Sequence, residues 1–155
     1  MRLSVTQSLA GALLVAGCSL MPWSGPPTID TREVSFRVAP DVNGDHPVET
    51  DIVYVLDPKL TDTLLATEAR QWFADKEKVL RDFPKGALVR HWEFAQGSRP
   101  VDQKVEGPEG SAVAAFLFAN YTTPGAHRAR LDPFERPVVK MLAADFLIDD
   151  KTDAP

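Results

Sequence analysis

Two almost wholly apolar runs constrain the fold of this 155-residue chain more than any other feature. Residues 52–56 read IVYVL, and residues 112–121 read AVAAFLFANY. Successive side chains of a β-strand point to opposite faces of the sheet, so a strand that is apolar at both parities must be covered on both faces. The two runs therefore predict central strands with a layer on each side, and the alanines of the second run indicate that something packs closely over it.

A third strand and one helix follow from hydrophobic periodicity. Residues 33–38 alternate polar and apolar side chains, as in a strand with one face buried. Between residues 61 and 83 apolar side chains recur at steps of three, four and seven, which predicts one helix with a single apolar stripe. Thr61 and Thr67 are its candidate caps, and Pro84 is expected to end it.

The remaining strands are predicted from shorter patterns, at residues 88–94, 126–131 and 138–148. Residues 96–110 are expected to form a loop because they are rich in glycine and proline. Strands separated by turns, with one inserted helical segment, predict a mainly β fold. We expect a two-sheet β-sandwich with an inserted helical segment.

The N-terminus has the composition of an export signal. A positive start at Met1-Arg2 is followed by an apolar run that ends in LVAGC at residues 14–18. The run is about half as long as the roughly 20 residues that span a bilayer. LVAGC resembles the lipobox of bacterial lipoproteins, in which the cysteine becomes the first mature residue and carries acyl chains on its sulfur and nitrogen. We expect a lipoprotein signal peptide at residues 1–17 and lipid attachment at Cys18; the alternative is a non-lipidated signal peptide that contains a cysteine.

Lipidation at Cys18 bears on location and on the rest of the chain. Because it is the only cysteine, no disulfide is expected, and the fold must rest on its core. Ser19 resembles the residue that follows the cysteine in outer-membrane lipoproteins, which places the domain on the periplasmic face of that membrane. The expected organisation is a flexible tether at residues 18–31, a β-sandwich domain at 32–149 and a tail at 150–155.

Composition and motifs exclude several classes of function. The chain has 22 acidic and 17 basic residues and a net charge of −5, without a run of Lys or Arg, so nucleic-acid binding is not expected. It has no nucleophile elbow, H-E-x-x-H, P-loop or dinucleotide-binding glycine pattern. We therefore expect no catalytic residues, no metal site and no cofactor. An enzyme with an unfamiliar site around His91, Glu93 and Asp145 stays open as a third hypothesis.

One loop is dense in turn-forming residues and lies between the first two expected strands. It contains Asp41, Val42, Asn43, Gly44, Asp45 and His46. Oxygen ligands at alternate positions resemble the start of a calcium-binding loop. The sixth position, however, is His46 instead of glycine, and the twelfth is Ile52 instead of glutamate. An exposed, Asx-rich turn at the tip of a hairpin is the simpler interpretation.

The order of these segments resembles the TssJ family, the outer-membrane lipoproteins of the bacterial type VI secretion system. The segments that carry the resemblance are the lipobox, Ala39-Pro40-Asp41-Val42-Asn43, His46-Pro47-Val48, Tyr54-Val55-Leu56, the helix around residues 73–80, Gln96-Gly97, Ala119-Asn120-Tyr121 and the final strand at 138–148. The first loop is shorter than is usual in the family. Tyr121-Thr122 and His127-Arg128 stand where Tyr-Arg and Trp-Arg pairs are typical, so the chain resembles a divergent member or a close neighbour.

The resemblance implies a transthyretin-like β-sandwich and a scaffold without enzymatic activity. Such a protein holds the periplasmic domain of an inner-membrane partner, TssM, and TssL completes the membrane complex. In the family the loop between the first two strands contacts TssM, which corresponds here to residues 41–46. The alternative hypothesis is a periplasmic lipoprotein that binds a small ligand, calcium or a cell-wall glycan.

Overall fold

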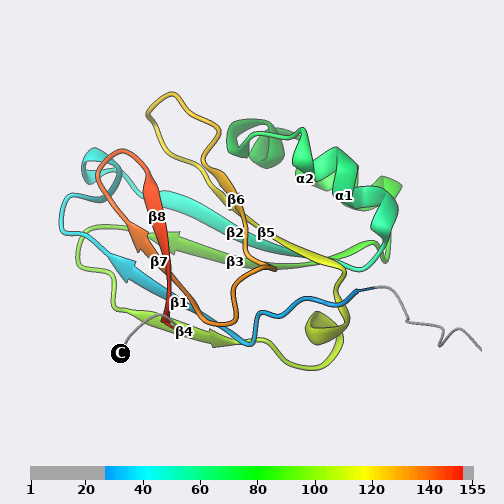
Figure 1. Cartoon of the computed structure of the whole chain (residues 1–155). Helices are drawn as coiled ribbons and strands as arrows, with labels where there is room; N and C mark the ends of the chain where they lie inside the picture. The colour runs from blue at the N-terminus through cyan, green and yellow to red at the C-terminus, as the bar shows by residue number, and fades with distance from the viewer. Residues whose placement is uncertain (1–26, 152–155) are drawn as a thin grey trace, which may run out of the picture.

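Two four-stranded sheets stack face to face, and two helices cover the outer face of one of them (Figure 1). The computed structural model describes residues 27–151. Sheet A has the strand order β4-β1-β7-β8, and sheet B has the order β3-β2-β5-β6. The elements are β1 (Glu33–Val38), η1 (Val42–Asp45), β2 (Val48–Val55), α1 (Pro58–Leu65), α2 (Ala69–Asp82), β3 (Ala87–Phe94), β4 (Val101–Lys104), η2 (Gly107–Ser111), β5 (Ala114–Ala119), β6 (Arg128–Arg130), β7 (Pro137–Met141) and β8 (Phe146–Asp150). The predicted β-sandwich with an inserted helical segment is confirmed.

The two apolar runs form the central strands of sheet B, as predicted. β2 pairs with β3 on one side and β5 on the other, and β5 also pairs with β6. Ile52, Tyr54 and Leu117 point into the core between the sheets. Phe116 and Phe118, at the other parity of β5, point outward into a second core beneath the helices. The alanines of β5 lie in both cores, so the expectation of close packing over this strand holds on both faces.

The prediction of one helix over residues 61–83 was wrong, because the segment forms two helices. α1 begins earlier, where the Asp57 side chain accepts a hydrogen bond from the backbone N–H of Lys59 at 3.0 Å and proline occupies the first turn. It ends at Leu65, and Arg128 of β6 donates hydrogen bonds to the carbonyl oxygens of Leu64 and Leu65. Neither predicted threonine is a cap, since the N-cap residues are Asp57 and Glu68.

Two further expectations for sheet A were also wrong. Residues 138–148 form two strands instead of one, because the chain reverses at residues 142–145, where the N–H of Leu142 donates to the carbonyl oxygen of Asp145 at 2.9 Å. β8 then runs to Asp150, the first residue of the expected tail at 150–155. The expected loop at 96–110 contains β4, which pairs with β1 at the edge of sheet A.

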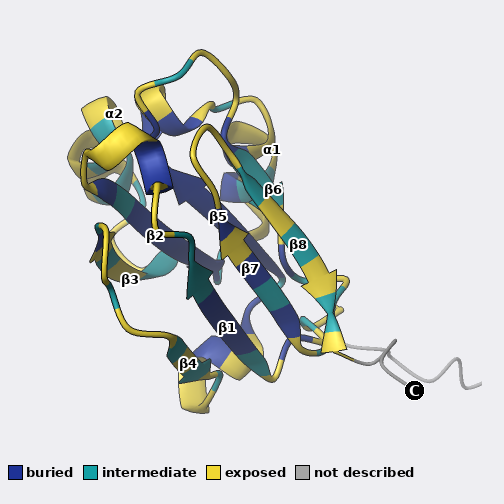
Figure 2. Cartoon of the chain, turned by 90° about the vertical axis from the view of Figure 1, so that its left-hand side faces the viewer, coloured by how far each residue is buried: buried dark blue, intermediate teal, exposed yellow. Residues whose placement is uncertain are grey.

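The outer face of sheet A carries no helix and is lined by polar side chains. Arg37 of β1 lies 3.0 Å from the carboxylate of Asp102 on β4, and Lys140 pairs with Asp149 between β7 and β8. A hydrogen bond from Ser35, followed by one from Arg37, lowers the pKa of the Asp102 carboxyl below its ordinary value. Along β8, exposed residues alternate with partly buried ones, whereas β2 and β5 are almost wholly buried (Figure 2).

The chain enters the sandwich at residues 27–31, the last part of the expected tether. The N–H of Ile29 donates to the carbonyl oxygen of Ala112 at 3.0 Å. The buried hydroxyl of Thr31 donates to the carbonyl oxygen of Leu131 at 2.7 Å. The predicted signal peptide, Cys18 and most of the tether lie outside the described residues. Within residues 27–151, none of the helices is long and apolar enough to cross a membrane.

Candidate functional site: the loop end of the sandwich

Three connections lie together at the end of the sandwich opposite residue 27 (Figures 1 and 2). They are the β1–β2 loop (residues 39–47), the β5–β6 loop (residues 120–127) and the β7–β8 turn (residues 142–145), and we call them the loop end. β1 begins where the chain enters and finishes at the first of these loops. Loops that a rigid scaffold holds in place are where proteins usually position binding residues.

The β1–β2 loop is held in an unusual backbone conformation. Asn43, Gly44 and Asp45 have φ angles of 50°, 59° and 68°, in the left-handed region that these three residue types tolerate best. The side chain of Asn43 donates to the carbonyl oxygen of Pro47 at 3.0 Å. Its own Oδ1 accepts hydrogen bonds from the backbone N–H and the hydroxyl of Thr122, at 2.8 and 3.0 Å. The tip therefore has a fixed shape and is tied to the β5–β6 loop.

The six residues predicted to bind a partner divide into two groups in the structure. Val42 and Asn43 are buried, and they support the loop from beneath. The exposed residues of this set are Asp41, Gly44, Asp45 and His46. Any direct contact by this loop as it stands therefore comes from those four residues.

His127 joins the β5–β6 loop to the β7–β8 turn. Its Nδ1 lies 2.9 Å from Oδ1 of Asp145, and its Nε2 lies 2.9 Å from the carbonyl oxygen of Thr123. The hydroxyl of Thr123 also donates to the carbonyl oxygen of Ala144 at 2.6 Å. Gly125 is required here, because a Cβ at this position would lie 2.8 Å from Cε1 of His127.

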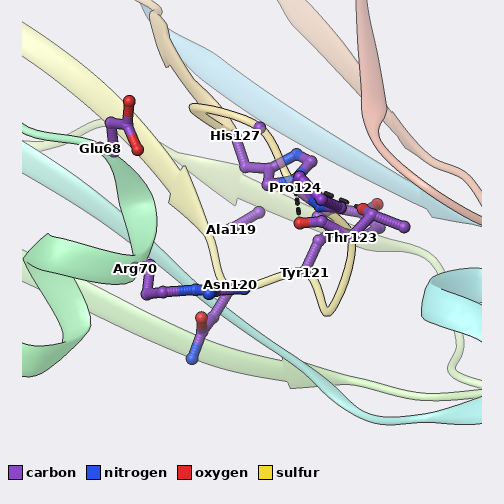
Figure 3. A pocket seen from close by; sticks show the side chains of 9 residues that line it. Glu68, Arg70, Ala119, Asn120, Tyr121, Thr123, Pro124 and His127 are labelled. Carbon is purple, nitrogen blue, oxygen red and sulfur yellow. Dashed lines mark hydrogen bonds between the residues drawn. The ribbon is translucent and has the colours of Figure 1, made fainter.

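A pocket of about 190 Å³ lies between the β5–β6 loop and the start of α2 (Figure 3). Glu68 and Arg70 line it from the helix, while Asn120 and His127 line it from the loop. The N–H of Ala69 donates to the carbonyl oxygen of Ala126 at 2.8 Å, which holds the two walls together. The pocket offers charged and amide groups to a small polar ligand.

A buried carboxylate lies on the outer face of sheet B, at a position that was not predicted from the sequence. Asp51 of β2 is fully buried and accepts hydrogen bonds from Nε1 of Trp72 at 2.9 Å and Nζ of Lys76 at 3.0 Å. Its other oxygen lies 2.5 Å from Nδ1 of His91. The arrangement fastens α2 to the sheet, and the only signal in the sequence is an aspartate directly before an apolar run.

The hypothesised enzymatic set is divided between different partners. His91 pairs with Asp51, whereas Asp145 pairs with His127 at the loop end. Glu93 lies opposite Glu49 in the β2–β3 register. Among residues 27–151, no group of three or more His, Cys, Asp or Glu side chains is arranged to hold a metal ion. Neither the enzyme hypothesis nor the calcium hypothesis gains support from this geometry.

Comparison with known proteins gives a match at the level of structure. No family model matches the sequence, and no curated protein matches it. The solved structure of the type VI secretion lipoprotein TssJ1 from Pseudomonas aeruginosa is similar, with a TM-score of 0.57 and 14% sequence identity over 81% of this chain and 98% of that chain. Lip from Serratia marcescens, a membrane-bound component of the type VI secretion system, is similar with a TM-score of 0.52 and 11% identity over 78% of this chain and 99% of that chain. The chain has the β-sandwich fold of these lipoproteins, so the resemblance found in the sequence is confirmed for the fold.

Proposed function

We propose that this chain is a lipid-anchored scaffold of a type VI secretion membrane complex. It is attached to the periplasmic face of the outer membrane through acyl chains on Cys18 and holds the periplasmic domain of an inner-membrane, TssM-like partner. The observation that carries the proposal is the likeness of fold to two type VI secretion lipoproteins over 98% and 99% of their lengths. The lipobox at residues 14–18 is independent support from the sequence.

The arrangement of the two ends suits a molecule that links a membrane to a partner. Residue 27 and the loop end lie at opposite ends of the sandwich (Figure 1). An anchor before residue 27 leaves the exposed tip of the β1–β2 loop free to face away from the membrane. The partner then contacts Asp41, Gly44, Asp45 and His46, and TssL joins the complex indirectly through the TssM-like protein.

Attachment is tested by Cys18→Ser in the full-length protein. Without the thiol the acyl chains cannot be added, and stable anchoring by more than one chain is lost. We expect the variant to leave the outer-membrane fraction and secretion to fail, while the amount of folded protein stays the same. Outer-membrane fractionation of the variant together with normal secretion contradicts the proposal.

Partner binding is tested with the purified periplasmic domain of the TssM-like protein from the same bacterium. The double variant Asp41→Ser and His46→Ser changes two exposed side chains and leaves Asn43 and its hydrogen bonds in place. We expect weaker capture of the domain and an unchanged melting temperature. Unchanged capture assigns the contact to another surface.

The pocket supports a second candidate function, the binding of a small polar ligand such as a cell-wall glycan fragment. Its lining by Arg70 and Asn120 offers hydrogen-bond donors. Binding of soluble muropeptides should raise the melting temperature by linkage, and Arg70→Ala should abolish the shift. A melting temperature that does not respond to muropeptides eliminates this candidate.

A further inference from the structure

The three loops of the loop end are one connected surface. The N–H of Asn43 donates to the carbonyl oxygen of Leu142 at 3.2 Å, so the first loop is joined to the β7–β8 turn. Asn43 also binds Thr122, and His127 binds Asp145. Each loop is therefore bonded to both of the others. A surface that is already ordered loses less conformational entropy when a partner binds.

The β7–β8 turn gives this surface exposed apolar side chains. Leu142 is 37% exposed, and it is one of three large apolar side chains of residues 27–151 that are exposed. The other two, Leu65 and Leu147, lie on α1 and on the outer face of sheet A. Ala143 and Ala144 continue the apolar surface along the turn. Single exposed leucines are common, but Leu142 is followed directly by two further exposed apolar residues on a surface formed by three connected loops, and exposed apolar side chains that gather in this way favour docking.

The exposed charged side chains of the loop end are acidic. The three loops together contain Asp41, Asp45 and Asp145, all exposed, and they contain no lysine or arginine. Charges at the rim of an interface guide association and select the partner more than they add affinity. Exposed apolar side chains together with acidic ones fit a surface of the opposite charge, with an apolar side chain surrounded by basic residues.

We infer that the docking surface is composite, with Leu142 at its centre and the β1–β2 loop as only one part of it. The occupant is a protein surface with an apolar side chain flanked by Lys or Arg. The inference rests on the proposed function and deepens it, since it says which residues of this chain meet the partner and what chemistry the partner presents. Predictions from sequence placed the contact in residues 41–46 alone.

A matched pair of leucine variants tests the role of Leu142. Leu142→Ser and Leu147→Ser make the same chemical change at two exposed positions, of which only the first belongs to the loop end. The hydrogen bonds of Leu142 to Asn43 and Asp145 use its backbone, so they survive the substitution. With the full chain in detergent and the TssM-like periplasmic domain as the probe, we expect Leu142→Ser to raise Kd about tenfold and Leu147→Ser to change it by less than about twofold.

The role of the acidic side chains is tested by charge removal at Asp45. Asparagine adopts the positive φ of this position readily, so Asp45→Asn removes charge without straining the loop. We expect slower association and a weaker dependence of the rate on salt concentration. Asp62→Asn, on the exposed side of α1, is the control and should leave both unchanged.

The outcomes separate this inference from the proposed function. If the wild-type chain does not bind the probe at all, the proposed function is wrong and the inference falls with it. If the wild-type chain binds but Leu142→Ser binds equally well, or if both leucine variants lose the same affinity, the composite surface is wrong and the proposed function stands. Equal association rates for Asp45→Asn and the wild type contradict a role of the acidic side chains in guiding association.

Discussion

In both sheets every second side chain of a strand points outward, but the outward side chains are buried in one sheet and exposed in the other. On sheet B the outward residues of β5 include Phe116 and Phe118, and helices bury them. On sheet A the outward residues of β7 and β8 include Lys140 and Leu147, and they stay exposed. We call these the covered face and the open face. The comparison teaches that the inserted helices are needed by one sheet only, because only that sheet is apolar on both sides.

The largest difference between the two faces is expected in the stability lost when an apolar side chain is replaced by alanine. Trp72 of α2 is fully buried, and its ring stacks on Phe118 with centroids 5.1 Å apart. Trp72→Ala should lower the free energy of unfolding by about 3–5 kcal/mol, because it leaves a cavity under the helix. Urea denaturation gives the measurement.

The control for Trp72 on the open face is Leu147→Ala, at a side chain that is 58% exposed. A change within about 0.5 kcal/mol is expected there. Similar losses for the two variants mean that the faces do not differ as described.

A smaller difference is expected for two carboxylates, each of which pairs with a lysine. Asp51→Ala on the covered face leaves Lys76 and the N–H of Trp72 without their buried acceptor, and should cost about 2–4 kcal/mol. Asp149→Ala on the open face removes a pair that solvent screens, and should cost less than about 1 kcal/mol. Thermal and urea unfolding of the two variants compare them directly, and a larger loss for Asp149→Ala reverses the comparison.

The smallest effect on stability is expected for the ion pair between Arg37 and Asp102 on the open face. Arg37→Ala should leave the melting temperature nearly unchanged, because its pair with Asp102 is exposed. The pKa of Asp102 should rise toward its ordinary value and remain below it, since the hydrogen bond from Ser35 is the larger cause of its lowering. Because a lowered pKa stabilises the fold above the unfolded pKa, this small contribution disappears as the pH falls through the folded pKa.

Measurement of Asp102 by NMR titration of the wild type and of Arg37→Ala gives both pKa values. An Asp102 pKa that does not move shows that Arg37 does not act on this carboxyl.

Secondary-structure elements were predicted correctly where their sequence pattern is local. The predicted bounds of β1 match the structure, and the core of β5 was found because its apolar run is read without knowledge of its neighbours. The division between α1 and α2 was missed because the apolar stripe continues across residues 66–68. β4 was missed because a short edge strand, with Asp102 and Lys104 exposed, has almost no apolar pattern.

The candidate site was only partly visible in the sequence for a related reason. The β1–β2 loop stood out because Asx and glycine residues are concentrated in it. Its partners could not be found, since Asn43 and Thr122 are 79 positions apart in sequence. Leu142 and His127 carry no motif, and they matter only because tertiary packing brings their loops together.

The position of β1 has a mechanical consequence. The strand runs from the entry of the chain to the β1–β2 loop, and it is bonded to β4 on one edge and to β7 on the other. Under the proposed function, a load between the anchor before residue 27 and a partner at the loop tip pulls along the strand axis. The backbone hydrogen bonds of β1 to β4 and β7 are then loaded together in shear and do not open one after another. The strand that carries the tension is therefore hydrogen-bonded along both of its edges.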